Sequence, residues 1–348
     1  MTRGRLRAHD LRRIKTQPIY RNGLVQRLLY SSPTVTHLLE DCYRLVLARI
    51  MRPEAKADAD DLEARIAEFA ARFPDAIGTC DEEPVFLLAA GWRSGSTLLQ
   101  RVLMSSGELL IWGEPFARSG IVQKLSDHFR AFTREWPPPS YFVDSFPGEL
   151  SGHWIANSYP CAADLIASHR AFLIQLLAAP AHSRGRKRWG FKEVRLDGGH
   201  ARYLKLLFPK ARLVFLVRDP YACYASFRHY IKSDFLAWPE TPIHSAKDFG
   251  GLWRRLASSF EDAQKDIGGL WLQYEEYLRD PGLHRALCEY VGADLKPPDR
   301  MDLIASSGHA GVSETRSDAA RLLWWERRGI ERAAGECARR LGYSGARG

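Results

Sequence analysis

The stretch Leu87–Leu103, "LLAAGWRSGSTLLQRVL", holds the first residues whose types and spacing suit chemistry. An apolar run meets a small polar turn at Gly95, and an amphipathic segment follows, in which we expect a helix from Thr97. Glycine permits unusual dihedrals, and the amides and positive dipole end of a helix N-terminus attract anions. The stretch therefore predicts an anion-binding loop made of Arg93, Ser94, Gly95, Ser96, Thr97 and Leu98.

A kinase or NTPase of the phosphate-loop class is one kind of protein that such a loop could belong to. This loop, however, departs from the pattern of that class. That class carries Gly-x-x-x-x-Gly-Lys-Ser/Thr, in which the lysine reaches the outer phosphates. Here Ser96 replaces the lysine, and Ala90 stands where the first glycine would be. The cation of this loop is Arg93, which precedes the glycine. The loop thus keeps its cradle for an anion but lacks the residue that reaches a γ-phosphate.

A second anion-binding segment is "LVFLVRDPYACYASF", from Leu213 to Phe227. It reads as a strand that ends in Arg218, followed by a helix that begins with a proline and carries Ser226. A terminal phosphate monoester carries nearly two negative charges, and a guanidinium can hold it with paired hydrogen bonds. Arg218 and Ser226 are therefore predicted to bind a terminal phosphate.

Together the two motifs resemble the sulfotransferases that use 3′-phosphoadenosine 5′-phosphosulfate (PAPS). "RSGSTLL", from Arg93 to Leu99, matches their 5′-phosphosulfate loop, while Arg218 and Ser226 match their 3′-phosphate segment. The resemblance covers residues 84–280. It implies PAPS as the donor, which has no γ-phosphate and so explains the missing lysine. It also implies a reaction that needs no metal.

The resemblance also implies roles for catalytic residues. Sulfuryl transfer to a hydroxyl requires proton removal, in-line approach and stabilisation of charge on the bridging oxygen. Glu114 in "IWGEPF" matches the base of tyrosylprotein sulfotransferases, and Lys192 in "RWGFKEV" matches a lysine that neutralises the bridging oxygen. Arg93 would share that role. The alternatives are a turn-capping carboxylate at Glu114 and a surface ion pair between Lys192 and Glu193.

Further candidates follow from the same resemblance. His128 and His153 are fallback bases, because the aryl sulfotransferases of the cytosol use histidine. Arg316 in "GVSETRS" is a further ligand for the 3′-phosphate. Tyr274 and Glu275 in "QYEEYLRDP" would support the donor site from below. Beside the loop, the ring of Trp92 is a candidate to stack on adenine or on an acceptor.

The elements that position these residues alternate between strands and helices from Pro84 onward. This alternation predicts an α/β fold with a P-loop-like parallel sheet flanked by helices. We expect a helical N-terminal extension at 1–80 and a sulfotransferase α/β domain at 81–348. Within it, a lid-like insertion at 117–187 would shape the acceptor pocket. The predicted strands are "PVFLLAA", "LLIW", "RWGFKEV", "ARLVFLVRD" and "LWLQY".

Charge and composition bound the remaining functions. The net charge is +9, but residues 1–28 hold eight Lys and Arg against one acid, a net +7, so no basic face for nucleic acid is evident. The six cysteines form no Cys-x-x-Cys pair, which disfavours a zinc or redox site. No apolar stretch approaches a membrane span. We therefore expect a cytoplasmic, bacterial enzyme.

The acceptor is less constrained than the donor. The sequence is compatible with a hydroxyl on a small molecule, a carbohydrate or a lipid, and it leaves the oligomeric state open. A catalytically inactive relative that only binds the nucleotide is a further alternative. Glu114 and Lys192, both retained, argue against it.

Overall fold

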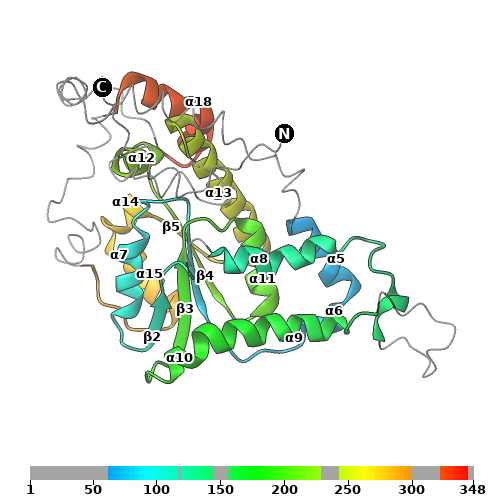
Figure 1. Cartoon of the computed structure of the whole chain (residues 1–348). Helices are drawn as coiled ribbons and strands as arrows, with labels where there is room; N and C mark the ends of the chain where they lie inside the picture. The colour runs from blue at the N-terminus through cyan, green and yellow to red at the C-terminus, as the bar shows by residue number, and fades with distance from the viewer. Residues whose placement is uncertain are drawn as a thin grey trace, which may run out of the picture. The chain divides into compact units, whose positions relative to one another are not determined.

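Five strands in the described part of the chain form one parallel sheet, in the order β2-β3-β1-β4-β5 (Figure 1). The computed structural model describes residues 62–116, 119–143, 156, 158–228, 243–298 and 322–343. Two of the central strands, Val85–Ala89 and Arg212–Val217, are almost continuously apolar, as strands buried on both faces are. The strands are β1 Val85–Ala89, β2 Leu109–Trp112, β3 Arg188–Glu193, β4 Arg212–Val217 and β5 Leu270–Gln273. The α/β fold and all five predicted strands are confirmed.

Helices cover both faces of this sheet. α7 (Ser96–Met104) follows β1, and α15 (Pro281–Val291) lies on the same side; α11 (Gly198–Leu207) follows β3 on the other side (Figure 1). The part of α13 (Ala246–Ile267) from Arg255 onward packs beside α11, since Gly198 N–H donates to Ser259 Oγ at 2.9 Å. β1 thus leads into a helix on one side of the sheet, and its neighbour β3 leads into a helix on the other. Ligands in such sheets bind where the strand order reverses, at the carboxyl ends.

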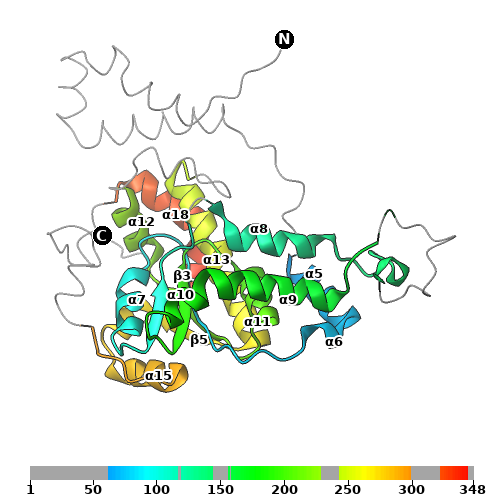
Figure 2. The same ribbon diagram turned by 60° about the horizontal axis from the view of Figure 1, so that its bottom comes forward.

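The segment between β2 and β3 is mostly helical. Its described elements are α8 Ile121–Asp127, η2 His128–Ala131, η3 Pro139–Tyr141, α9 Ala162–Leu173, η6 Ile174–Ala178 and α10 Ala179–His182. Both views show α9 running toward the pair α5 (Leu62–Arg72) and α6 (Pro74–Ile77) (Figures 1 and 2). Phe69 of α5 makes edge-on contacts with Phe129 and Phe132, at ring-centroid distances of 4.9 and 4.8 Å. This aromatic cluster joins α5 to the segment.

One described helical run, Ala162–His182, is long and apolar enough to cross a membrane by length and composition, with a mean hydropathy of 1.2. This is weak evidence for a span, because a core helix of a soluble protein passes the same test. Ile166, Leu173 and Leu177 of this run are buried inside the protein. Their burial explains the apolar composition.

The chain divides into two compact units. The first unit holds the sheet and comprises Ala57–Arg218 and Arg255–Val312, and the second includes Asp219–Arg254 and Ser313–Gly348. The described helices of the second unit are α12 (Pro220–Arg228), the first part of α13 and α18 (Trp324–Arg340). A buried ion pair between Arg228 and Glu326 joins α12 to α18. The proposed boundary between residues 80 and 81 stays a prediction, and residues 1–61 lie outside the described residues.

Candidate active site

The loop between β1 and α7 has the backbone of an anion cradle. Gly91, Arg93 and Gly95 have φ values of 86°, 63° and 87°, so left-handed residues alternate along the loop. Such alternation turns successive N–H groups inward and forms a concavity for anions. α7 begins at Ser96, one residue before the predicted start, and no side chain caps it. No side chain therefore competes with a bound anion for the first amides of α7.

The side chains of this loop divide into binding and structural groups. Ser94 is fully buried, and within the described structure its hydroxyl has no hydrogen-bond partner. A buried hydroxyl without a partner is costly, so Ser94 fits a donor to a bound anion. Leu98 packs in the core at 1% exposure, and its amide donates to the Gly95 carbonyl at 3.0 Å. Trp92, the candidate to stack on adenine or on an acceptor, is 6% exposed, so its ring is largely buried within the protein.

Arg218 lies directly beside this loop. Its Nη1 donates to the Arg93 carbonyl at 2.9 Å, and its Nε lies 3.8 Å from Glu275 Oε1. The guanidinium also stands over the ring of Tyr274, 4.6 Å from the ring centroid. Because β4 and β5 follow β1 in the sheet, their carboxyl ends bring Arg218 and Tyr274 to the loop. Arg218 of the second predicted segment therefore lies beside the first predicted segment, at the carboxyl ends of the strands.

Tyr274 also explains why residue 95 is a glycine. A Cβ at Gly95 would lie 2.1 Å from Cε2 of Tyr274, far inside contact distance. The Tyr274 ring is thus packed between the loop and the Arg218 guanidinium. This contact matches the supporting role predicted for Tyr274, and Glu275 lies beside Arg218 on the same turn of α14 (Tyr274–Tyr277).

Glu114 and Lys192 are in direct contact. Lys192 Nζ donates to Glu114 Oε1 at 2.5 Å, and their side chains are 11% and 20% exposed. Trp112 at the end of β2 pairs with Phe191 of β3, which sets Glu114 just beyond β2 next to Lys192. Lys192 also pairs with Leu87 of β1, so this pair lies beside the strand that leads into the loop. The alternative interpretation, a surface pair between Lys192 and Glu193, is wrong.

Glu193 binds a different partner. Its carboxylate accepts from the Arg195 side chain at 2.9 and 3.1 Å and from the Val194 amide at 2.8 Å. Both charged side chains are almost fully buried, at 2% and 3% exposure. Burial raises the pKa of the Glu193 carboxyl, and Arg195 opposes that shift. The sequence reasoning missed this pair, which joins the last residue of β3 to the bend that follows it.

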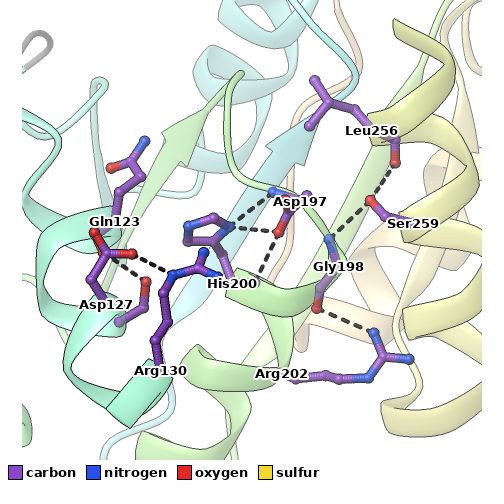
Figure 3. Close-up of polar contacts among 10 residues, drawn as sticks. Gln123, Asp127, Arg130, Asp197, Gly198, His200, Arg202, Leu256 and Ser259 are labelled. Atoms are coloured by element: carbon purple, nitrogen blue, oxygen red, sulfur yellow. Dashed lines mark hydrogen bonds and ion pairs between the residues drawn. The ribbon is translucent and has the colours of Figure 1, made fainter. Parts of the chain in front are cut away.

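The turn that follows is tied down by polar contacts (Figure 3). Asp197 caps α11 by accepting from the His200 amide, and His200 Nδ1 lies 2.6 Å from Asp197 Oδ1. Burial raises the pKa of Asp197, but the His200 charge and hydrogen bonds outweigh burial and hold that pKa well below its usual range. These contacts fix where β3 ends and so help to fix the position of Lys192.

The family model of the "Sulfotransferase family" matches residues 84–297, more than half of the chain. The chain belongs to this family. The matched region contains the loop, Glu114, Lys192 and Arg218, and the family is one of PAPS-dependent transferases. The protein is therefore a sulfotransferase. Among curated proteins, no sequence matches this chain.

Several solved sulfotransferase structures are similar to this chain at low identity. The sulfotransferase domain of the curacin biosynthetic pathway shares 16% identity, covering 76% of this chain and 99% of its own, with a TM-score of 0.45. The domain from the Synechococcus PCC 7002 olefin synthase shares 15%, covering 77% and 97%, with a TM-score of 0.41. A sulfotransferase of Mycobacterium avium shares 16%, covering 97% and 96%, with a TM-score of 0.36.

The remaining predicted residues of this sulfotransferase are Ser226, His128, Arg316 and His153. Ser226 is on α12 in the second unit. His128, on η2, places Nδ1 3.1 Å from Nε2 of His169, and no contact between His128 and Glu114 or Lys192 is seen among the described residues. Arg316 and His153 lie outside the described residues.

Proposed function

We propose that this sulfotransferase moves the sulfuryl group from PAPS to a hydroxyl of a small-molecule, carbohydrate or lipid acceptor, with Glu114 as the base. The observation that carries the proposal is the 2.5 Å contact between Lys192 Nζ and Glu114 Oε1. Lys192 lies on β3, next to the loop strand β1, and Glu114 follows β2, the next strand beyond β3. A carboxylate and an ammonium are thereby held beside the anion cradle. These two groups are what hydroxyl activation and leaving-group stabilisation require.

The donor would be held at both ends. The amides that begin α7, together with Ser94, Ser96, Thr97 and Arg93, would bind the 5′-phosphosulfate. Arg218, held over Tyr274, would bind the 3′-phosphate, with Ser226 and Arg316 as further ligands. The Ser94 hydroxyl, buried and without a partner in the described structure, supports this assignment. So does an α7 N-terminus that no side chain caps.

The transfer step would balance as follows. Glu114 takes the proton from the acceptor hydroxyl as its oxygen bonds to sulfur. The bond from sulfur to the bridging oxygen breaks, and its electron pair stays on that oxygen, which leaves as part of adenosine 3′,5′-bisphosphate. Lys192 and Arg93 stabilise the negative charge that develops there. The carboxylate is restored when the proton passes to solvent.

The Glu114→Gln variant tests the base. We expect nucleotide binding to persist and transfer to fall about 10²–10⁴-fold, because an amide cannot accept the proton. Transfer is measured with labelled PAPS and a panel of hydroxylated acceptors, and binding by thermal shift with adenosine 3′,5′-bisphosphate. A ligand at a hundred times its dissociation constant adds roughly 2.7 kcal/mol to stability.

The chain offers a matched control for this variant. Glu108 and Lys187 stand before β2 and β3, at the opposite ends of the same two strands, and also lie 2.5 Å apart, but this pair is exposed. Glu108→Gln should leave transfer unchanged. Full transfer by Glu114→Gln would show that another group is the base. Stabilisation by ATP and Mg²⁺ equal to that by the bisphosphate would favour a kinase.

A further inference from the structure

Phe116 combines two unusual features just beyond Glu114. Its side chain is 64% exposed, among the most exposed large apolar side chains in the described structure. Its φ is 52°, and the other non-glycine residue with positive φ in the described part of the chain is Arg93 of the anion loop. A bulky residue in this region of φ is an outlier and is typical of functional sites. Arg93 lies in the anion loop, and Phe116 lies two residues beyond Glu114.

Neither packing nor the local turn accounts for a phenylalanine here. The turn is closed by backbone and hydroxyl contacts, with Ser119 N donating to the Phe116 carbonyl at 3.0 Å. Glycine would adopt the same φ without strain. The ring, mostly in solvent, gains little from burial in the free protein. A phenylalanine with a strained backbone and an exposed ring is explained if that ring contacts a ligand.

We propose that Phe116 is a specificity-determining residue whose ring contacts the acceptor, and that the acceptor is an alcohol or phenol with an apolar body next to its hydroxyl. This inference rests on the proposed function. The acceptor oxygen must reach Glu114, and two residues span at most about 7 Å of chain. An acceptor held at Glu114 by its oxygen would then place the neighbouring carbon atoms against the ring. Aromatic rings in binding sites contribute chiefly by covering apolar surface.

The test compares two acceptors of opposite character, 4-nitrophenol and glucose, with labelled PAPS. Phe116→Ala should lower kcat/KM for 4-nitrophenol about tenfold or more and leave any transfer to glucose unchanged. Phe116→Leu, which keeps an apolar side chain, should fall between. Phe172→Ala is the matched control, because Phe172 is also an exposed phenylalanine (44%) but lies on α9. It should behave as the unmodified protein.

Two further readouts distinguish a contact with the acceptor from a role of the ring in the fold. The melting temperature of Phe116→Ala and its shift with adenosine 3′,5′-bisphosphate should both stay unchanged. A lower melting temperature would mean that the chain itself covers the ring, which overturns the proposal. The role proposed for Phe116 would be overturned if Phe116→Ala lowered kcat/KM equally for both acceptors, or if the unmodified protein transferred to glucose alone. Either result would leave the proposed sulfotransferase function standing. Transfer to neither acceptor, with ATP and Mg²⁺ as the better stabiliser, would overturn both.

Discussion

Single residues at this site serve both fold and chemistry, and Gly95 shows how. Its φ of 87° turns the loop, and its missing side chain leaves room for the Tyr274 ring. That ring in turn supports the Arg218 guanidinium. The missing side chain of Gly95 thus allows the contact that links the proposed phosphosulfate loop, through Tyr274, to Arg218 at the proposed 3′-phosphate site.

Gly95→Ala should therefore be much more damaging than a change of backbone preference alone. The added Cβ would meet Tyr274 Cε2 at 2.1 Å, so the ring and Arg218 must move. We expect the thermal shift with adenosine 3′,5′-bisphosphate to be lost and the free energy of unfolding to fall by about 2–4 kcal/mol. Chemical denaturation measures the second effect.

Gly91→Ala provides the comparison within the same loop. Gly91 has nearly the same φ, 86°, but a Cβ there meets nothing within 4 Å. It should cost about 1 kcal/mol and retain nucleotide binding. If the two variants behaved alike, the contact with Tyr274 would not matter to the site.

At the scale of elements, the end of β3 and the bend after it carry three charged residues with different partners. Lys192 contacts Glu114, while Glu193 and Arg195 form a buried pair with each other. Arg195→Met would leave the Glu193 carboxylate buried without its guanidinium. We expect a loss of about 3–5 kcal/mol in stability, measured by urea unfolding, and recovery of part of it in Glu193→Gln/Arg195→Met.

A partly exposed ion pair serves as the comparison for the buried Glu193–Arg195 pair, because it shows how much burial adds to the stability lost with the arginine. Arg130 Nε and Asp127 Oδ1 lie 2.7 Å apart, with side chains 31% and 40% exposed. Arg130→Met should cost no more than about 1 kcal/mol. A similar small loss in Arg195→Met would mean that the pair at the end of β3 does not hold the strand in place.

The elements were predictable where one local pattern decides them. The runs "VFLLA" and "RLVFLV" are apolar at every core position, and they predict β1 and β4 directly. α15 is not among the predicted helices, although Asp280 caps it, Pro281 opens it and Gly292 ends it with a φ of 70°. A capping aspartate followed at once by proline is a start signal that the sequence does carry, so this helix was within reach of local reasoning.

Partners between elements were less accessible to sequence reasoning. That Lys192 meets Glu114 depends on β2 lying next to β3, a pairing of segments 78 residues apart that no local pattern encodes. The same holds for Arg218 and Arg93, which are 125 residues apart. Family resemblance supplied each residue separately, and the strand order brought them together. Phe116 carried no signal, because its backbone strain and exposure appear only in three dimensions.

At the scale of the whole molecule, buried polar contacts join the helices between β2 and β3 to the core. His169 of α9 is 4% exposed and contacts His128 of η2 on one side and Tyr203 of α11 on the other, at 3.1 and 2.9 Å. Tyr203 is fully buried, and burial raises its pKa far above its usual range. Three helical elements therefore meet at one neutral imidazole.

The protonation of His169 makes the stability of the whole protein depend on pH. Burial, with a smaller effect from His128, lowers the pKa of His169 from 6.5 to about 4. Between these values the unfolded chain binds a proton that the folded protein does not, so stability is complete above pH 6.5 and falls as the pH drops toward 4. From pH 7 to 5 the loss from this residue is roughly 1–2 kcal/mol.

Replacing this imidazole tests the pH dependence directly. His169→Gln should remove that part of the slope while lowering stability at pH 7, because the amide does not titrate but fits the contacts with His128 and Tyr203 less well. Chemical denaturation across the range measures both effects. His182→Gln, which alters a partly exposed histidine 3.9 Å from Glu82, is the matched control for the loss of an imidazole. An unchanged slope in His169→Gln would mean that this imidazole titrates normally in the folded protein.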